Sequence, residues 1–149
     1  MSDNWLQYLP KDPSFKPSPF AAASAESLLR TWLPEAESVE SEFHGRIRFF
    51  EGGENFSGAH CPACGADTEG WWSDAIGASA QTGFADLSCV APCCGAVVSL
   101  NGLRYNWPAG FASYSLEAMN PNSRGLSFAQ IARLEQELGC ELREVPLHL

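Results

Sequence analysis

The sequence lacks basic residues over its whole central region. No Lys or Arg occurs between Arg48 and Arg104, although six Asp and Glu residues lie there, and the chain has a net charge of −9 at pH 7. Nucleic acids and anionic membranes are bound largely by cationic side chains close to their phosphates. This region is therefore a poor surface for DNA, RNA or an anionic membrane, and the charge favours a basic protein as the partner.

Long apolar runs are also missing. No stretch approaches the ~20 apolar residues of a membrane helix, and residues 1–15 have neither the basic start nor the apolar run of a signal peptide. We therefore expect a soluble, cytoplasmic protein, and the length of 149 residues is that of a single domain, 1–149. In a reducing compartment, the six cysteines are more often metal ligands or buried thiols than disulfides.

Enzyme signatures are scarce. The sequence contains no P-loop, GxGxxG, HExxH or GxSxG motif, and its three histidines are His44, His60 and His148. A thiol nucleophile needs a histidine within hydrogen-bond reach, and Cys140 with His148 is the pairing to consider. Because Cys140 follows the predicted end of a helix, where a small buried residue is expected, we predict that the chain is not an enzyme. A small enzyme with a Cys140–His148 site is the alternative.

An extended arm (1–19) and a helix–strand unit (20–51) make up the N-terminal third of the chain. Four prolines between positions 10 and 19 indicate an extended conformation for the arm, which either packs on its own domain or docks on a partner. Ser18 and Pro19 predict the start of a helix with one apolar stripe. Residues 38–50 then alternate between apolar and polar side chains, which predicts a strand with one face buried.

A second helix–strand unit occupies residues 126–149. Ser127 and Gln130 form a capping box at the predicted start of the helix, and Gly139 fits a left-handed C-cap at its end. Pro146 places the last strand at the edge of a sheet, because proline cannot donate a hydrogen bond to a neighbouring strand. The residues predicted to face the core are Phe128, Ile131, Leu134, Leu138, Val145, Leu147 and Leu149.

Two short cysteine motifs at the centre of the chain indicate a metal site. They are CPACG at residues 61–65 and PCCG at residues 92–95. These motifs resemble the rubredoxin-like knuckles of the zinc-ribbon family, and the resemblance covers roughly residues 56–107. It implies a zinc ribbon inserted between the two helix–strand units, in which tight turns direct thiolates at one metal ion.

The second motif does not have the full CPxCG pattern, so the fourth ligand has to be inferred from distances. Ala91 stands where the first cysteine of a second CPxCG motif would lie. Cys93 is inside the turn. Cys89 lies on the preceding strand, about 6–7 Å further from the turn, and this distance is large compared with a Zn–S bond of ~2.3 Å. The predicted zinc ligands are Cys61, Cys64, Cys93 and Cys94, with Cys89 and His60 as alternatives to Cys93. Four thiolates saturate a zinc ion, so we expect the metal to be structural.

The residues around the second motif indicate two hairpins. Residues 84–90 are predicted to pair with residues 96–100 across the PCCG turn. Asn101 and Gly102 favour a type I′ turn, so residues 103–107 are predicted to pair back on residues 96–100.

Two segments outside the hairpins are rich in aromatic residues. The connection 66–83 contains Trp71 and Trp72, which either cover the metal site or contact a partner. The segment 106–121, which begins with Trp107, is predicted to be irregular, and its aromatic residues either pack in the core or anchor an interface.

Together these observations predict an α+β fold: a small sheet with helices on one face and an inserted zinc ribbon. The chain is also similar to a class of small bacterial proteins that carry CPxCG, PCCG, SLN and WPxGF segments, a resemblance that implies the fold alone. The predicted function is a non-enzymatic binding module, most concretely a bacterial immunity or inhibitor protein that neutralises a basic toxin or enzyme. A zinc-ribbon accessory protein of nucleic-acid machinery is a further alternative. The residues predicted to contact the partner are Glu35, Glu37, Glu40, Glu42, Trp71, Trp72 and Trp107.

Overall fold

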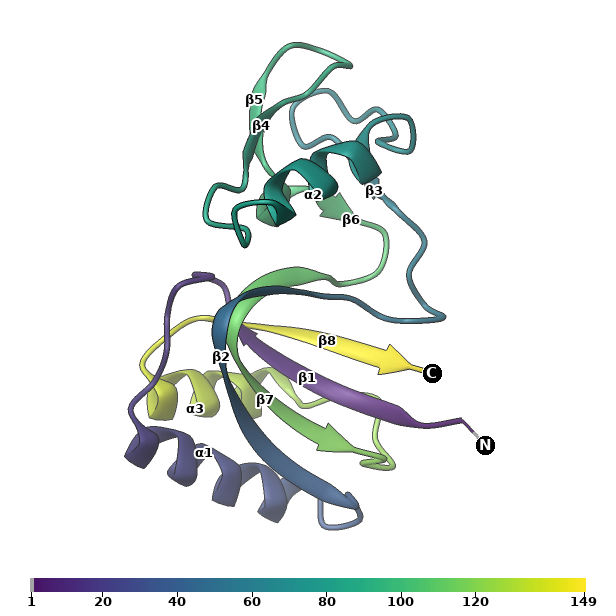
Figure 1. The fold of residues 1–149 in the computed structure, drawn as a ribbon. Helices are drawn as coiled ribbons and strands as arrows, with labels where there is room; N and C mark the ends of the chain where they lie inside the picture. Colours follow the sequence, from purple (N-terminus) through teal and green to yellow (C-terminus); the bar gives the residue numbers. More distant parts are fainter. Residues whose placement is uncertain (1) are drawn as a thin grey trace.

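The computed structural model describes residues 2–149, which form a sheet part and an inserted ribbon joined by two connections (Figure 1). The sheet part consists of β1 (Asn4–Pro10), α1 (Pro19–Trp32), β2 (Ser38–Phe50), β7 (Gly110–Met119), α3 (Phe128–Leu138) and β8 (Leu142–His148). The ribbon, residues 51–109, contains β3 (Ala59–His60), α2 (Trp72–Ala80), β4 (Ser88–Val90), β5 (Val97–Ser99), a 3₁₀ turn (Leu100–Gly102) and β6 (Arg104–Tyr105). This arrangement confirms the predicted α+β class.

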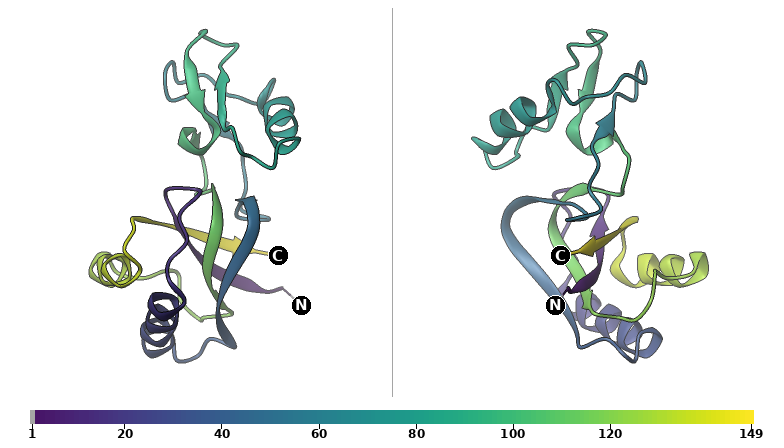
Figure 2. Two further views of the ribbon diagram at one scale, coloured as in Figure 1. Left: turned by 60° about the vertical axis from the view of Figure 1, so that its left-hand side comes forward. Right: turned by 90° about the vertical axis from the view of Figure 1, so that its right-hand side faces the viewer.

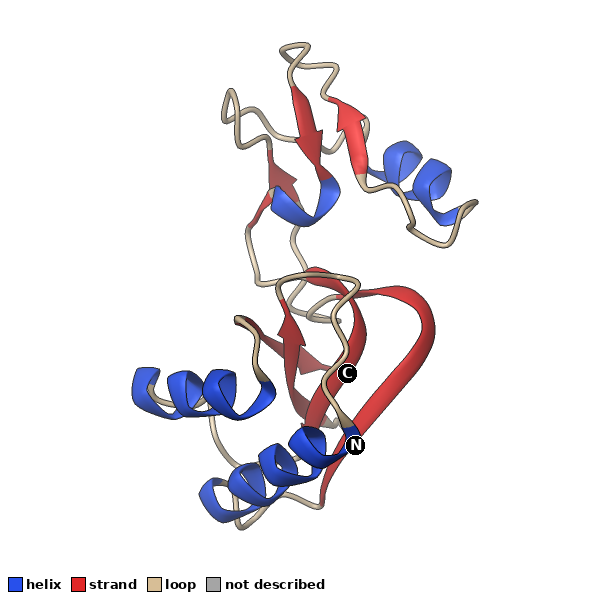
Figure 3. Ribbon diagram, turned by 90° about the vertical axis from the view of Figure 1, so that its left-hand side faces the viewer, coloured by secondary structure: helices blue, strands red, loops and turns tan. Residues whose placement is uncertain are grey.

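The sheet is antiparallel, with strand order β2-β7-β1-β8. Helices α1 and α3 lie on the same side of it (Figure 3), and their apolar residues pack with those of the strands in one core. The largest fully buried side chains of this core include Tyr8, Leu29, Tyr114, Leu116 and Leu134. Among the described residues, no helix is both long and apolar enough to cross a membrane.

Both long helices begin where their capping residues predicted, and α3 also ends at its predicted C-cap. The Ser18 hydroxyl accepts a hydrogen bond from the amide of Ala21, with Pro19 at the first helical position. At α3, Ser127 and Gln130 form the reciprocal capping box, and Gly139 ends the helix with a φ of 81°. These local signals satisfy backbone groups that a helix end leaves unpaired.

Some core predictions at the C-terminal unit are wrong. Phe128 is 94% exposed and Leu149 is 56% exposed, whereas Leu134, Leu138 and Val145 are buried as predicted. Phe128 is the first residue of α3, where the helix has not yet reached the sheet, and Leu149 lies beyond the end of β8. Pro146 does lie in an edge strand.

The predicted extended arm packs on its own domain, in agreement with that alternative, and its first half is a central strand of the sheet. Residues 4–10 form β1, which is paired on both sides, with β7 and with β8, and residues 6–10 are buried. Only the proline-containing residues 11–18 form the connection to α1. The apolar residues before the prolines are therefore part of the core of the sheet.

The irregular segment predicted at 106–121 is also wrong over most of its length. Residues 110–119 form β7, which pairs with β1 and β2 and is buried almost throughout. Phe111 and Tyr114 are core residues, in agreement with the packing alternative. Because β7 is buried on both faces, it lacks the clean apolar–polar alternation that marks a half-buried strand.

The single apolar face predicted for β2 is interrupted by a bulge. Phe43 pairs with Tyr114 but Arg48 pairs with Ala112, so four residues of β2 lie opposite one residue of β7. An extra stretch of this kind bends the strand and changes which face its side chains take, and β2 curls strongly in Figure 2. Beyond the bulge, Ile47 and Phe49 pack against the ribbon core and not against the helices.

The ribbon contains only one of the two predicted hairpins. β4 pairs with β5, as predicted, with Cys89 opposite Val98. The second hairpin is wrong: Asn101 lies in the 3₁₀ turn, and β6 pairs with β3. The Asn101 side chain instead accepts hydrogen bonds from the amide of Phe111 and from Arg143, which connects the ribbon to the sheet.

Candidate metal centre and neighbouring sites

The four cysteines predicted as ligands lie together at one end of the ribbon. The sulfur atoms of these residues all lie within 4.8 Å of one another. The residues are Cys61, Cys64, Cys93 and Cys94. Two of the Sγ–Sγ distances are 3.9 Å, between Cys61 and Cys94, and 3.4 Å, between Cys64 and Cys93. A tetrahedron with Zn–S bonds of ~2.3 Å has edges of about 3.8 Å. The thiols are therefore grouped as a tetrahedral metal site requires.

The two turns that present these thiols have the same backbone structure. The amide of Gly65 donates to the carbonyl of Cys61 at 2.8 Å, and the amide of Gly95 donates to that of Ala91 at 2.7 Å. Both glycines adopt a positive φ, of 79° and 75°. Ala91 thus occupies the place that Cys61 has in the first turn, and Cys93, two residues further along the turn, completes the group.

Backbone amides and neighbouring thiols set the protonation of the group. Hydrogen bonds from the amides of Cys64 and Ala63 lower the pKa of the Cys61 thiol to about 7. The hydrogen bond with Cys64 and burial raise the pKa of Cys93 to about 12. A bound cation would stabilise several thiolates held in such close contact.

The two alternatives to Cys93 lie outside the group. Cys89 is on β4 with its side chain packed in the ribbon core, where burial raises the pKa of its thiol. The His60 ring lies 2.8 Å from the side-chain oxygen of Asn106 and 3.8 Å from a carboxylate oxygen of Asp67.

The three tryptophans predicted as partner contacts are each held within the protein. Trp71 and Trp72 pack against the ribbon core, and both remain partly exposed. Trp107 donates from its indole nitrogen to the carbonyl of Pro146 at 2.8 Å and packs so closely on Gly52 that a side chain there would collide with it. Trp107 therefore covers part of the free edge of β8.

The four predicted acidic contacts occupy two neighbouring elements. Glu35 and Glu37 lie in the turn between α1 and β2, and Glu35 accepts a hydrogen bond from Asn122 at 2.6 Å. Glu40 and Glu42 follow on β2, and all four residues are exposed.

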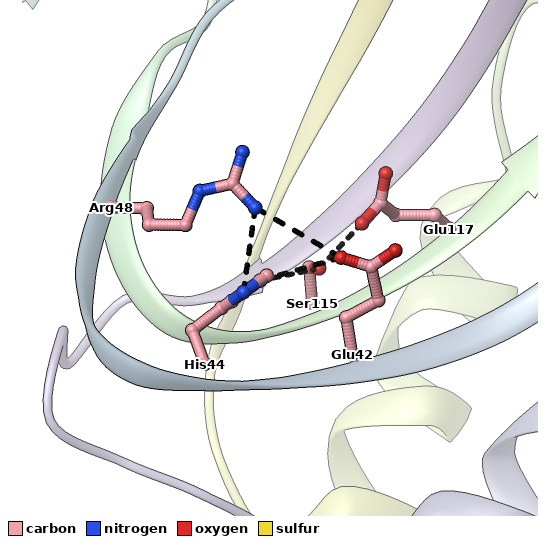
Figure 4. Close-up of polar contacts among 5 residues, drawn as sticks. All are labelled: Glu42, His44, Arg48, Ser115 and Glu117. Atoms are coloured by element: carbon pink, nitrogen blue, oxygen red, sulfur yellow. Dashed lines mark hydrogen bonds and ion pairs between the residues drawn. The ribbon is translucent and has the colours of Figure 1, made fainter.

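A polar cluster on β2 and β7 is the second group of titratable side chains (Figure 4). Ser115 donates to Glu117 at 2.7 Å, and the His44 Nε2 atom lies 3.4 Å from the Ser115 hydroxyl and 3.8 Å from Glu42. Burial, and then the nearby Arg48, lower the pKa of His44. Because Ser115 is fully buried, the cluster presents no accessible nucleophile.

Glu117→Gln is expected to stabilise the protein at neutral pH. Burial and the nearby Glu42 and Glu40 raise the pKa of Glu117, and Glu40 lies directly opposite it in the register. A raised pKa in the folded state means that stability falls as pH rises through it. The gain at pH 7 is on the order of 0.5–1 kcal/mol, as for a cross-strand like-charge pair, and it vanishes near pH 4, where both states are protonated.

Urea unfolding of the wild type and the variant at pH 4 and pH 7 measures this difference. Glu141→Gln, at an exposed position, is the matched control and should change stability little at either pH. A variant that gains as much stability at pH 4 as at pH 7 would contradict a charge effect at Glu117.

The Cys140–His148 pair predicted for the enzyme alternative does not form. Cys140 lies two residues before the extended strand β8 and His148 is its last residue, roughly 25 Å further along the chain. The His148 ring instead contacts the side chains of Asn4, at 2.6 Å, and Glu54, at 3.2 Å.

Comparison with protein-family models, with curated proteins and with solved structures gives no match for the chain.

Proposed function

We propose that Cys61, Cys64, Cys93 and Cys94 hold a structural zinc ion. The donor set supports this, because four thiolates in a tetrahedral arrangement suit zinc, with iron as the other metal of such sites. Four protein ligands leave no open position for a substrate, so the ion stabilises the ribbon and does not activate water.

The function that we propose for the whole chain is binding to a basic protein partner, as an immunity or inhibitor protein that neutralises a toxin or enzyme. The observation that supports it most is the charge of the stretch that makes up most of the ribbon: residues 49–103 carry six carboxylates and no Lys or Arg. A zinc ion with four thiolates adds a formal charge of about −2. Such a field speeds encounter with a basic surface and repels nucleic acid.

The acidic residues of β2 and the preceding turn extend this field onto the sheet part. The exposed Glu40 and Glu42 lie on β2 near the partly buried Glu117, and like charges this close reduce the stability of the fold. A cationic partner surface placed on these carboxylates would relieve the repulsion. Because this repulsion destabilises the free protein, we assign Glu40 and Glu42 to partner binding.

The test is the salt dependence of association with the partner. The protein is used to capture a partner from the source cells, and the purified partner is then measured by surface plasmon resonance. We expect a basic partner whose association rate falls at least roughly ten-fold between about 0.05 and 0.5 M salt. An association rate that stays constant up to ~0.5 M salt would exclude electrostatic steering.

Charge variants locate the steering surface. Glu40→Gln with Glu42→Gln should slow association at low salt by several-fold and leave dissociation nearly unchanged, because rim charges act on the encounter. Glu137→Gln with Glu141→Gln, which removes the same charge in and beyond α3, is the matched control and should have a smaller effect. Equal effects of the two pairs would contradict a role for the β2 acids.

A further inference from the structure

A concave site lies on the ribbon, between the segment that follows β2 and the start of α2. It is a cavity of about 330 Å³, near the lower end of the range for small-molecule sites. The residues that line it are Phe56, Ser57, Gly58, Asp67, Thr68, Glu69, Trp72 and Ser73. Two aromatic rings, two carboxylates and small polar residues thus meet at one place.

The aromatic walls of the cavity are fixed by packing. The ring centroids of Phe56 and Trp72 lie 5.3 Å apart with an angle of 38° between the ring planes. Phe49 contacts both rings, and the Trp72 indole nitrogen donates to the Tyr105 hydroxyl at 3.3 Å. A ligand would therefore find these walls already in place, which lowers the entropic cost of binding.

The two carboxylates of the cavity have no Lys or Arg partner to neutralise them. Asp67 and Glu69 are both exposed, and among residues 2–149 no Lys or Arg side chain lies within 4.0 Å of either. One Asp67 oxygen accepts a hydrogen bond from the amide of Glu69 at 2.7 Å, and the other lies 3.8 Å from the His60 ring. Negative charge thus stands unpaired beside the aromatic rings.

We propose that this cavity binds an alkylammonium group, which the basic partner presents as a lysine side chain. The identity of the partner rests on the proposed function, but the chemistry of the cavity stands by itself. A cation is attracted to the faces of aromatic rings and to carboxylates, and no other class of ligand gains from both.

Two competing ligands fit the cavity less well. A divalent metal would need more ligands, and the cysteines are the only group of three or more potential ligands found among the described residues. An anion would be attracted by the amino end of α2, which contributes about half a positive charge, but two full negative charges oppose it.

The probe for this site is tetramethylammonium chloride, titrated into ¹⁵N-labelled protein and followed by two-dimensional NMR. We expect a saturable shift of the Trp72 indole signal and of the amides of Ser57 and Glu69, with a dissociation constant of roughly 1–10 mM. Tert-butyl alcohol, which has a similar shape but no charge, should give no saturable shift.

Variants then separate the cavity from the general charge of the ribbon. Asp67→Asn with Glu69→Gln should weaken binding of the probe at least about ten-fold, and Phe56→Leu should weaken it several-fold. Asp74→Asn with Asp86→Asn removes the same charge from the ribbon outside the cavity and should change binding less than two-fold, as screening predicts. Well-dispersed spectra of all variants verify the fold.

Two results would overturn the proposal. One is the absence of a saturable shift with tetramethylammonium in the wild type, and the other is equal weakening by the two double variants. The purified partner gives an independent comparison: a partner that binds the Asp67→Asn, Glu69→Gln variant as tightly as the wild type overturns the lysine assignment but leaves the proposed function intact. Probe binding without any basic partner would support the cavity and contradict the proposed function.

Discussion

Chelation of the proposed zinc ion is expected to unfold the ribbon while the sheet part stays folded. The ribbon strands are two or three residues long, and two-stranded sheets of this size are marginal by themselves. Structural zinc contributes an apparent binding free energy of about 10–16 kcal/mol in zinc-finger peptides. The sheet part has its own core, built by α1, α3 and the four long strands.

Two-dimensional NMR before and after treatment with a chelator reads the two parts separately. Signals of the ribbon should lose dispersion, signals of the β1, β7 and β8 core should remain, and one zinc ion per chain should be released. Cys64→Ser and Cys93→Ser should reproduce the effect, whereas Cys140→Ser, outside the group, should retain the metal. Metal binding that survives Cys93→Ser but not Cys89→Ser would show that Cys89, and not Cys93, is the fourth ligand.

Arg143→Ala is expected to destabilise the protein by about 2–3 kcal/mol, the largest effect we predict for a residue outside the metal site and the apolar cores. The guanidinium donates to the carbonyl of Ala109 at 2.7 Å and to the side chain and carbonyl of Asn101 at 3.1 and 3.3 Å. Asn101 belongs to the ribbon and Arg143 to β8, so these bonds connect the two parts. Removal of the charged donor leaves the buried Ala109 without this bond.

Urea unfolding of metal-loaded protein tests this connection. Arg133→Ala is the matched control, since Arg133 forms only an exposed helical pair with Glu137 and should cost about 0.5 kcal/mol or less. Arg143→Lys should recover little of the loss, because an ammonium group cannot reach the three acceptors that the planar guanidinium reaches. A loss for Arg143→Ala no larger than the control would show that the contacts add no stability.

The parts of the fold that could be predicted are those with local signals. Ser18, Ser127 and Gly139 mark helix ends through bonds to residues three or four positions away, so the sequence alone carries the information. β1 and β7 were missed because both are central strands: their pairing partners lie up to 144 residues away and their burial on both faces removes the alternation. Asn101 with Gly102 resembles a hairpin turn, yet the contacts of Asn101 with Arg143 determine its conformation.

The metal group could be predicted from local signals in the sequence, whereas the cavity could not. Cys61, Cys64, Cys93 and Cys94 could be identified because each thiol pair lies within one short turn and the glycines mark that turn. Phe56 comes from another segment than Asp67 and Trp72, and nothing in their spacing indicates that they line one cavity. Likewise, nothing in the sequence around Arg143 indicates that its side chain connects the ribbon to the sheet part.

The position of the ribbon within the chain affects the order in which the protein folds. β2 and β7 are neighbours in the sheet, with Phe50 opposite Gly110, so their pairing closes a loop that contains the entire ribbon. Closing a long flexible loop costs more entropy than closing a short one, and a ribbon already folded around its metal brings the ends of β2 and β7 together in advance. Metal supply during synthesis thus affects how quickly the edge strand β2 can pair with β7, as well as the stability of the ribbon.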